Sequence, residues 1–258
     1  MREDDIIRTG DVLVFRRPER EEPPVPRNYL VIYEDRHVLV ADKPAGLPVA
    51  PSGVFFHHTL LHFLRAERPA EILHPAHRLD RETSGLLVFT KSAEAARSLA
   101  VAFRERKVRK EYEALLRGML EREVTAAAPV GRLDDTTRRF SYGITATGKE
   151  SVTTFTPLAS CPASGLTRVR AVPITGRIHQ VRIHAAHIGH PILGDALYGE
   201  KQPEGAHAAP RLALHSSRIV FPHPEGEKEF RSSPPEWFRE VFRIRGDQGR
   251  ESSCGNSP

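Results

Sequence analysis

The residues best suited to chemistry in this chain surround one aspartate, Asp80, which lies between Arg78 and Arg81. Opposite charges within a few Å favour the ionised carboxylate, a form suited to nucleophilic attack rather than to proton donation. The apolar run at 86–89 follows closely, so we expect Asp80 to lie at the mouth of a buried strand. A surface ion pair at a turn is the competing interpretation of the same residues.

The basic residues favour a nucleic-acid partner. They outnumber the acidic residues by 38 to 33, and 31 of them are arginine, which binds phosphate through paired hydrogen bonds and stacks on bases. A GC-rich genome would enrich arginine equally well. Two local clusters, at 104–110 and 138–139, flank the candidate chemistry and strengthen the nucleic-acid interpretation.

The bulk composition excludes several classes of protein. The 258 residues are 39% hydrophobic and 28% charged, as is ordinary for a soluble globular protein. No apolar run approaches the ~18 residues of a membrane span, and the first residues lack the apolar core of a secretory signal. Cys161 and Cys254 are far apart and form no CxxC pair, which argues against a disulfide framework or a thiolate metal site. We therefore expect a cytoplasmic protein.

The elements that must position these residues begin with a hairpin. Apolar runs at 30–33 and 38–41 are joined by a polar turn, and the prolines and glycine within 43–48 end the second strand. Ser92 predicts the N-cap of a helix reaching about Arg106. Residues 110–118 alternate in polarity, so Tyr112 should point inward, either as a core tyrosine or as part of a site.

A second helix is predicted to start after Thr175 and Gly176, with apolar residues recurring every three to four positions from Ile178 to Ile188 as one buried stripe. Gly189 suits a left-handed C-terminal cap, and Pro191 prevents continuation. Arg182 is expected at the edge of the apolar stripe, from where it could reach a pocket beside the core.

The two ends of the chain differ from its middle. Residues 1–26 are charged, with one short strand predicted at 12–15 and a proline-bearing linker at 21–26. The runs at 212–215 and 218–221 predict two further strands. The polar, Gly/Ser-rich tail at 246–258 is predicted to be disordered.

Three other kinds of site are disfavoured. The segment 143–149 matches a phosphate-binding loop, but Glu150 stands where a Mg²⁺-binding hydroxyl is needed. Four histidines lie close together (His179, His184, His187 and His190), yet no H-E-x-x-H occurs and the nearby arginines oppose a divalent cation. No G-x-S-x-G nucleophile motif is present. We expect no metal.

Four segments, taken in order, resemble the RluA-type RNA pseudouridine synthases. They are DKPAGL at 42–47, HRLDRETSGLL at 77–87, KEY at 110–112, and TGRIHQVR at 175–182, which continues through 189–199. Together they span roughly residues 29–242. One departure is Ile178, which stands where a threonine or serine is common in that family.

The resemblance implies an enzyme that breaks the N-glycosidic bond of selected uridines, rotates the uracil and rejoins it through carbon 5, without a metal or organic cofactor. It implies that Asp80 is the catalytic aspartate, that Tyr112 stacks on the target base and that Arg182 pairs with the aspartate. Arg78 would fill the space that the everted nucleotide leaves. The residues implied to bind RNA are Arg78, Arg81, Lys110, Arg177 and His179.

The fold implied is α+β: a single catalytic domain, residues 27–245, around a mixed, largely antiparallel sheet with flanking helices. Residues 1–26 resemble the end of an S4-type module. The expected partner is ribosomal or transfer RNA, with no membrane, and the expected state is a monomer. Whether Asp80 attacks the sugar, attacks the base or abstracts a proton is left open. A non-catalytic RNA-binding or ribosome-assembly factor on the same fold is the alternative, and a phosphate-ester hydrolase is a weaker third.

Overall fold

The structure is a computed structural model that describes residues 8–12, 21–133, 141–199 and 211–243. The predicted strand at 12–15 extends outside these residues, and both the basic pair at 138–139 and the tail at 246–258 lie wholly outside them. No helix in the described ranges combines the length and the apolar character that a membrane crossing requires.

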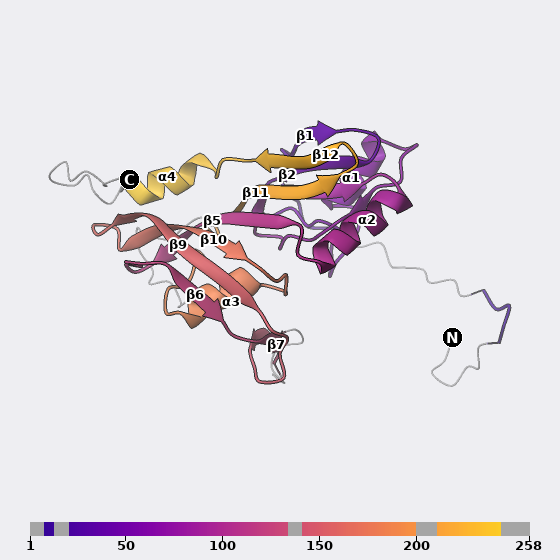
Figure 1. The fold of residues 1–258 in the computed structure, drawn as a ribbon. Helices are drawn as coiled ribbons and strands as arrows, with labels where there is room; N and C mark the ends of the chain where they lie inside the picture. Colours follow the sequence, from indigo (N-terminus) through magenta and orange to yellow (C-terminus); the bar gives the residue numbers. More distant parts are fainter. Residues whose placement is uncertain (1–7, 13–20, 134–140, 200–210, 244–258) are drawn as a thin grey trace.

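One mixed sheet organises the described part of the chain (Figure 1). All its strand pairs are antiparallel except β4–β11, which is parallel. Its main path runs β1 (Leu30–Glu34), β2 (Val38–Lys43), β4 (Ser84–Thr90), β11 (Leu214–His223), β5 (Arg109–Arg117), β10 (Leu166–Pro173), β9 (Val152–Cys161) and β6 (Val124–Ala127). β3 (His74–Pro75) joins β4, and β12 (Gly226–Arg231) joins β11. A separate small sheet pairs β7 (Val130–Arg132) with β8 (Tyr142–Ile144). The expected α+β fold is confirmed.

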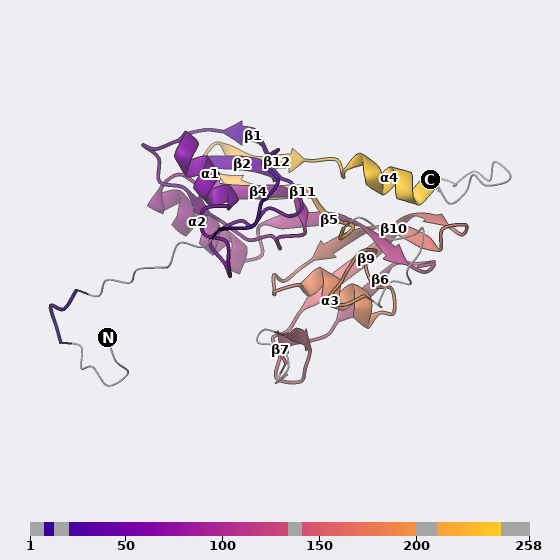
Figure 2. The ribbon, with the colours of Figure 1, turned by 180° about the vertical axis from the view of Figure 1, so that it is seen from behind.

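Four helices flank the strands: α1 (Leu60–Glu67), α2 (Ala93–Arg104), α3 (Gln180–His187) and α4 (Glu236–Arg243). α3 and α4 lie on opposite sides of β5, β9 and β10 in both Figure 1 and Figure 2. β2 and β4 are apolar on both faces because each face contributes to a separate buried cluster. One cluster joins Val40 and Val88 with Leu99 of α2, and the other joins Leu39 and Leu87 with residues of α1.

The first half of the chain follows its sequence pattern. The hairpin β1–β2 forms as expected. Helix α2 begins at Ala93 because the Ser92 hydroxyl accepts a hydrogen bond from the Ala95 N–H at 3.1 Å. β5 places Tyr112 inward, with only 7% of the residue exposed.

The second predicted helix differs from expectation at its start. α3 begins at Gln180 rather than directly after Gly176, because His179 has a left-handed φ of 54° that a right-handed helix does not tolerate. The single apolar stripe was also wrong: residues 180–185 are all buried, so the helix is enclosed all round. Gly189 does end the helix with a φ of 80°, as predicted.

Gly85 allows the strand after Asp80 to reach the middle of the sheet. Its φ is 107°, and a Cβ at this position would lie 2.3 Å from the carbonyl oxygen of Ser216. Only glycine therefore permits β4 to pair with β11 at this point. The close approach of Gly85 to Ser216 thus fixes the start of β4, which follows the Asp80 loop.

Candidate active site

The Asp80 loop lies between β3 and β4, and a buried lysine ties it to the end of β2. The Lys43 side chain is completely buried, and its ammonium donates hydrogen bonds to the carbonyls of Pro44, Leu47 and Arg81 at 2.8–3.1 Å. Burial lowers the pKa of Lys43 from 10.5 to about 7, although nearby carboxylates oppose the shift. The Lys43 ammonium thus anchors the Asp80 loop through a backbone carbonyl of that loop, the carbonyl of Arg81.

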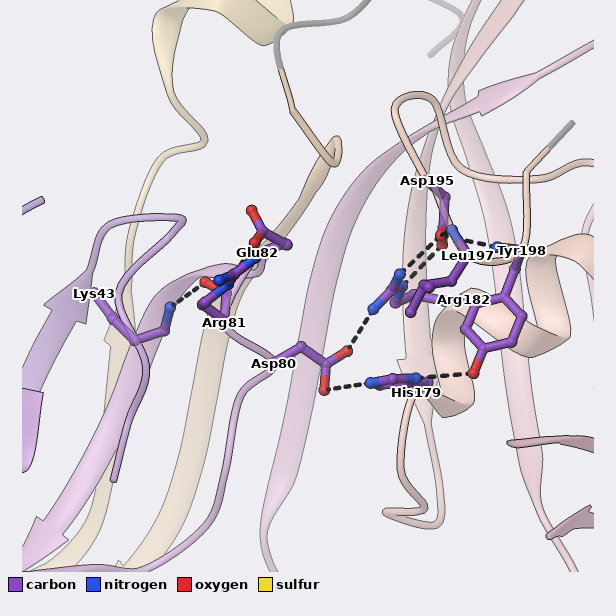
Figure 3. A network of polar contacts seen from close by, with 9 residues as sticks. All are labelled: Lys43, Asp80, Arg81, Glu82, His179, Arg182, Asp195, Leu197 and Tyr198. Carbon is purple, nitrogen blue, oxygen red and sulfur yellow. Dashed lines mark hydrogen bonds and ion pairs between the residues drawn. The ribbon is translucent and has the colours of Figure 1, made fainter. Parts of the chain in front are cut away.

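Asp80 meets two nitrogen-bearing side chains from α3 and its N-cap (Figure 3). The Arg182 Nη1 lies 3.3 Å from one carboxylate oxygen of Asp80, and the His179 Nε2 lies 3.7 Å from the other. Both groups are about 100 residues away in the sequence. The carboxylate is therefore held by tertiary contacts.

The predicted ion pairs between Asp80 and its neighbours in the sequence are wrong. Arg81 pairs instead with Glu82 at 2.7 Å and lies over the ring of Phe55, 5.4 Å from its centroid. Arg78 is exposed and forms no ion pair within the described residues, although it lines the cavities beside Asp80. Although Arg78 and Arg81 are close to Asp80 in the sequence, their guanidiniums do not point toward its carboxylate.

Arg182 is held in place by a second carboxylate. Its Nε and Nη2 each lie 2.8 Å from an oxygen of Asp195, whose side chain is fully buried. Asp195 also accepts the backbone N–H groups of Leu197 and Tyr198 at 2.9 and 3.1 Å. Burial alone would raise the pKa of Asp195, but the Arg182 guanidinium and these N–H groups lower it overall. The pKa of Arg182 is raised, because the two carboxylates outweigh its own burial.

His179 links the carboxylate to an aromatic side chain. Its Nδ1 lies 2.8 Å from the hydroxyl of Tyr198, whose ring also packs against the Arg182 guanidinium, 5.2 Å from centroid to carbon. Burial lowers the pKa of His179 and outweighs the charge of Asp80. At neutral pH the imidazole is therefore neutral, and the left-handed backbone at His179 aims it at Asp80.

Tyr112 contributes an aromatic wall beneath the carboxylate. Burial, reinforced by the negative charge of Asp80, raises the pKa of Tyr112 above its ordinary value. The phenol therefore stays protonated at neutral pH.

Two cavities, of about 220 and 530 Å³, meet at Asp80. Both are lined by Arg78, Asp80, His179 and Arg182, so the carboxylate stands in their common wall. The predicted site residues gather in the smaller cavity, with the exception of Arg81, which lines the larger one. The seven are Arg78, Asp80, Lys110, Tyr112, Arg177, His179 and Arg182.

The basic residues of the smaller cavity differ in their surroundings. Burial lowers the pKa of Lys110, whose ammonium lies over the Phe103 ring at 5.8 Å from the centroid. The exposed Arg177 reaches only the Glu150 carbonyl, at 3.4 Å. Both cations thus line the cavity without a carboxylate partner in the described part of the chain.

Four residues of the site were not singled out from the sequence: Lys43, His77, Asp195 and Tyr198. Lys43 and His77 lie within the motifs that carry the resemblance, and Asp195 and Tyr198 lie in the continuation of the last motif, but nothing in their spacing indicated what they contact. His77 accepts the Val88 N–H at 3.2 Å, and burial together with the charge of Lys110 lowers its pKa to about 3. His77 is thus a neutral imidazole that supports the strand after Asp80.

The disfavoured motifs have structural explanations. A Cβ on Gly148 would lie 2.8–2.9 Å from backbone atoms of Pro129 and Val130, so this glycine permits close packing against β7. His184 uses both ring nitrogens, on the Thr153 hydroxyl and the Ala128 carbonyl. His190 bonds to the carbonyl of Arg117. These contacts, together with that of His179 to Tyr198, direct three of the four histidines to separate parts of the fold.

Comparison with known proteins shows which family the chain resembles in sequence and fold. A family model described as RNA pseudouridylate synthase matches residues 37–187. The chain is 35% identical over 245 residues to the ribosomal large subunit pseudouridine synthase C of Vibrio cholerae, covering 90% of this chain and 75% of that protein. It is 37% identical over 205 residues to the dual-specificity RNA pseudouridine synthase RluA of Haemophilus influenzae, covering 78% and 90%. Its fold superposes on human RNA pseudouridylate synthase domain containing 1 with a TM-score of 0.70 and 29% identity, covering 86% and 89% of the two chains.

Proposed function

This chain belongs to the RluA-type RNA pseudouridine synthases, and we propose that it isomerises uridines of ribosomal or transfer RNA with Asp80 as the catalytic carboxylate. In the family reaction the bond from N1 to the sugar breaks and a bond from C5 to the sugar forms. The proton at C5 is lost and N1 gains one, so the atoms balance without an oxidant or a cofactor.

The arrangement around Asp80 is the observation that carries the proposal. The carboxylate stands in the wall of the smaller cavity, Tyr112 lines the same cavity, and Arg182 lies behind the carboxylate, fixed by Asp195. A cation held in this way keeps a negative charge favourable at Asp80 while a base covers it. An RNA-binding factor without catalysis has no need for such a carboxylate.

The target base has to leave its stack before it can reach Asp80, at a cost of a few kcal/mol. Stacking on Tyr112 returns about 1–3 kcal/mol. Arg78, which is exposed at the rim of both cavities, enters the vacated stack, and Lys110 and Arg177 attract the backbone phosphates. The side chains that line the cavities thus offset the free energy needed to move the base out of its stack.

The test of the catalytic role is Asp80→Asn against the matched control Glu82→Gln, which removes a carboxylate two residues away in the same loop. With RNA labelled with tritium at C5 of uridine, wild type and the control release tritium as carbon 5 is coupled to the sugar. Asp80→Asn releases none above background, while its thermal unfolding and RNA affinity stay near those of wild type. Tritium release by a folded Asp80→Asn protein would remove this residue from the mechanism.

The RNA class is tested by mapping pseudouridines in total RNA from cells with and without the gene. We expect loss of sites in ribosomal or transfer RNA, and loss only in other RNAs would contradict the proposal. The domain limits at 27 and 245, the cytoplasmic location and the monomeric state stay predictions.

A further inference from the structure

The strand that carries Tyr112 has a second face, turned away from Asp80. Side chains alternate along β5, so Glu111 and Glu113 point to the face opposite Tyr112. Residues paired across antiparallel strands share a face, and Arg170 pairs with Glu113 while Arg218 pairs with Glu111. Arg168, two residues before Arg170, joins them on this side.

These residues border a third cavity, of about 410 Å³, which contains an unusual number of guanidinium groups. Three serines, the two glutamates and Tyr112, which also lines the smaller cavity, contribute to its lining. We call its five arginines the arginine face: Arg168 and Arg170 of β10, Arg218 of β11, Arg231 of β12 and Arg239 of α4. Arg239 of α4 lines this cavity. Helix α4 lies on one side of β5, β9 and β10, and α3, which carries Arg182, lies on the other (Figure 1).

The carboxylates near the arginine face do not neutralise it. Arg218 bonds to Glu111 at 2.6 Å and to Glu229 at 2.8 Å, and Arg231 shares Glu229. The five guanidiniums therefore have three carboxylates near them, those of Glu111, Glu113 and Glu229, so the arginine face keeps a net positive charge.

Three of the five guanidiniums have hydrogen-bond donors that are not used. The Arg168 Nε lies 3.8 Å from a Glu113 oxygen, and this buried nitrogen has no hydrogen-bond partner among the described residues. Arg170 and Arg239 are exposed and form no ion pair in the described part of the chain. Three guanidiniums thus present unused donors at one cavity, an arrangement that favours an anionic ligand.

We propose that the arginine face binds phosphate groups of the substrate RNA outside the target nucleotide, on the side of the sheet opposite Asp80. This inference rests on the proposed function. Guanidinium forks match the oxygens of a phosphate, and neighbouring same-face residues of a strand stand about 6.6 Å apart, so two adjacent forks can engage successive groups of a chain. The substrate is a polyanion that is larger than the cavities around Asp80. An RNA segment that passes the sheet end is the occupant that matches this charge.

The experiment uses Arg170→Gln/Arg239→Gln, since both side chains are exposed and neither supports an ion pair within the described residues. The matched control, Arg97→Gln/Arg122→Gln, removes the same charge from exposed positions outside all the cavities described. Dissociation constants are measured for a long RNA fragment and for a short stem-loop that holds the same target uridine. Single-turnover tritium release at saturating RNA is measured in parallel.

For the arginine-face variant we expect the Kd of the long RNA to rise roughly 5- to 20-fold and the salt dependence to fall by about 0.7–0.9 in log–log slope per lost phosphate contact. The stem-loop affinity and the single-turnover rate stay unchanged. Equal losses in the control, equal losses with the stem-loop, or no loss with the long RNA would overturn the proposal.

Titration with inorganic phosphate, followed by the NMR signals of the arginine side chains, identifies a small anion as the alternative source. Phosphate binding without any change in affinity for long RNA would assign the site to a free anion and overturn the RNA assignment. These binding measurements do not depend on turnover, so a failure of the proposed function appears separately, as a wild-type protein that binds RNA and releases no tritium.

Discussion

Two buried cations hold the Asp80 loop, and they differ in what they bind (Figure 3). Arg182 reaches two carboxylates, those of Asp80 and Asp195, through three hydrogen bonds. Lys43 reaches three backbone carbonyls, and no carboxylate lies within salt-bridge distance of its ammonium among the described residues. The pKa of the arginine is raised, whereas burial lowers that of the lysine to about 7.

This difference indicates that one residue provides the positive charge next to Asp80 and another fixes the position of the Asp80 loop. Arg182 keeps its charge at any pH at which the protein folds, so it provides a constant counter-charge for Asp80. Lys43 fixes where the loop runs, and its charge is sensitive to pH near neutrality. The comparison predicts that losing Arg182 removes chemistry and that losing Lys43 mainly removes stability.

Replacement of Arg182 should have the largest effect. Arg182→Met leaves Asp195 buried without its cation, so we expect a loss of about 3–5 kcal/mol in the free energy of unfolding. We also expect the rate to fall by about 10²- to 10³-fold, because the counter-charge of Asp80 is lost with the guanidinium. Urea unfolding and tritium release measure the two effects.

The double variant Arg182→Met/Asp195→Leu separates the loss of stability from the loss of activity. Removing the stranded carboxylate should restore most of the stability, since an apolar replacement of a buried pair is often neutral, while activity stays lost. Recovery of activity in the double variant would show that the counter-charge is dispensable.

Lys43→Met should destabilise the fold by about 1–3 kcal/mol at neutral pH, because three carbonyls lose their donor. Its pH dependence is more informative. The folded pKa of about 7 lies below the unfolded value of 10.5, so between these pH values the unfolded state binds the extra proton. Wild-type stability should therefore rise with pH relative to Lys43→Met in this window, by at most about 1.4 kcal/mol per pH unit.

Urea unfolding of both proteins at pH 6, 8 and 9 measures this difference. A stability difference that does not change with pH would mean that the Lys43 ammonium keeps its proton throughout, as Arg182 does.

His179→Gln should have a smaller effect. The imidazole is neutral at neutral pH because burial lowers its pKa, so it orients Asp80 rather than moving a proton. We expect less than about a tenfold fall in rate, below the range of general acid–base catalysis, and the same rate–pH profile between pH 7 and 8 as wild type. Loss of a titration step from the profile would instead assign His179 a proton-transfer role.

Tyr112→Phe should have the smallest effect. The ring that stacks on the base is kept and the phenol is never ionised near neutrality, so RNA affinity should stay within about twofold, whereas Tyr112→Ala should lose about 1–3 kcal/mol. Equilibrium binding to the target stem-loop measures both, and a large loss in Tyr112→Phe would indicate that the hydroxyl contacts the substrate.

Much of the local structure could be predicted from the sequence because it depends on neighbouring residues. The cap at Ser92, the hairpin β1–β2 and the inward direction of Tyr112 follow from local hydrogen bonds and from the period of a strand. The start of α3 could not be predicted, because His179 has a left-handed backbone, which is uncommon for a residue other than glycine and which accompanies tertiary contacts with Asp80 and Tyr198.

The amino-acid sequence by itself determined which groups are available: the carboxylate of Asp80, the ring of Tyr112 and the guanidinium of Arg182, in motifs that identify the family. Only the tertiary structure decided which cation meets Asp80. Arg78 and Arg81 are its neighbours in the chain, yet Arg182, 102 residues away, makes the contact. The reason is that an ion pair requires matching direction and shared burial, which come from the packing of α3 against the sheet, whereas spacing along the chain specifies only distance.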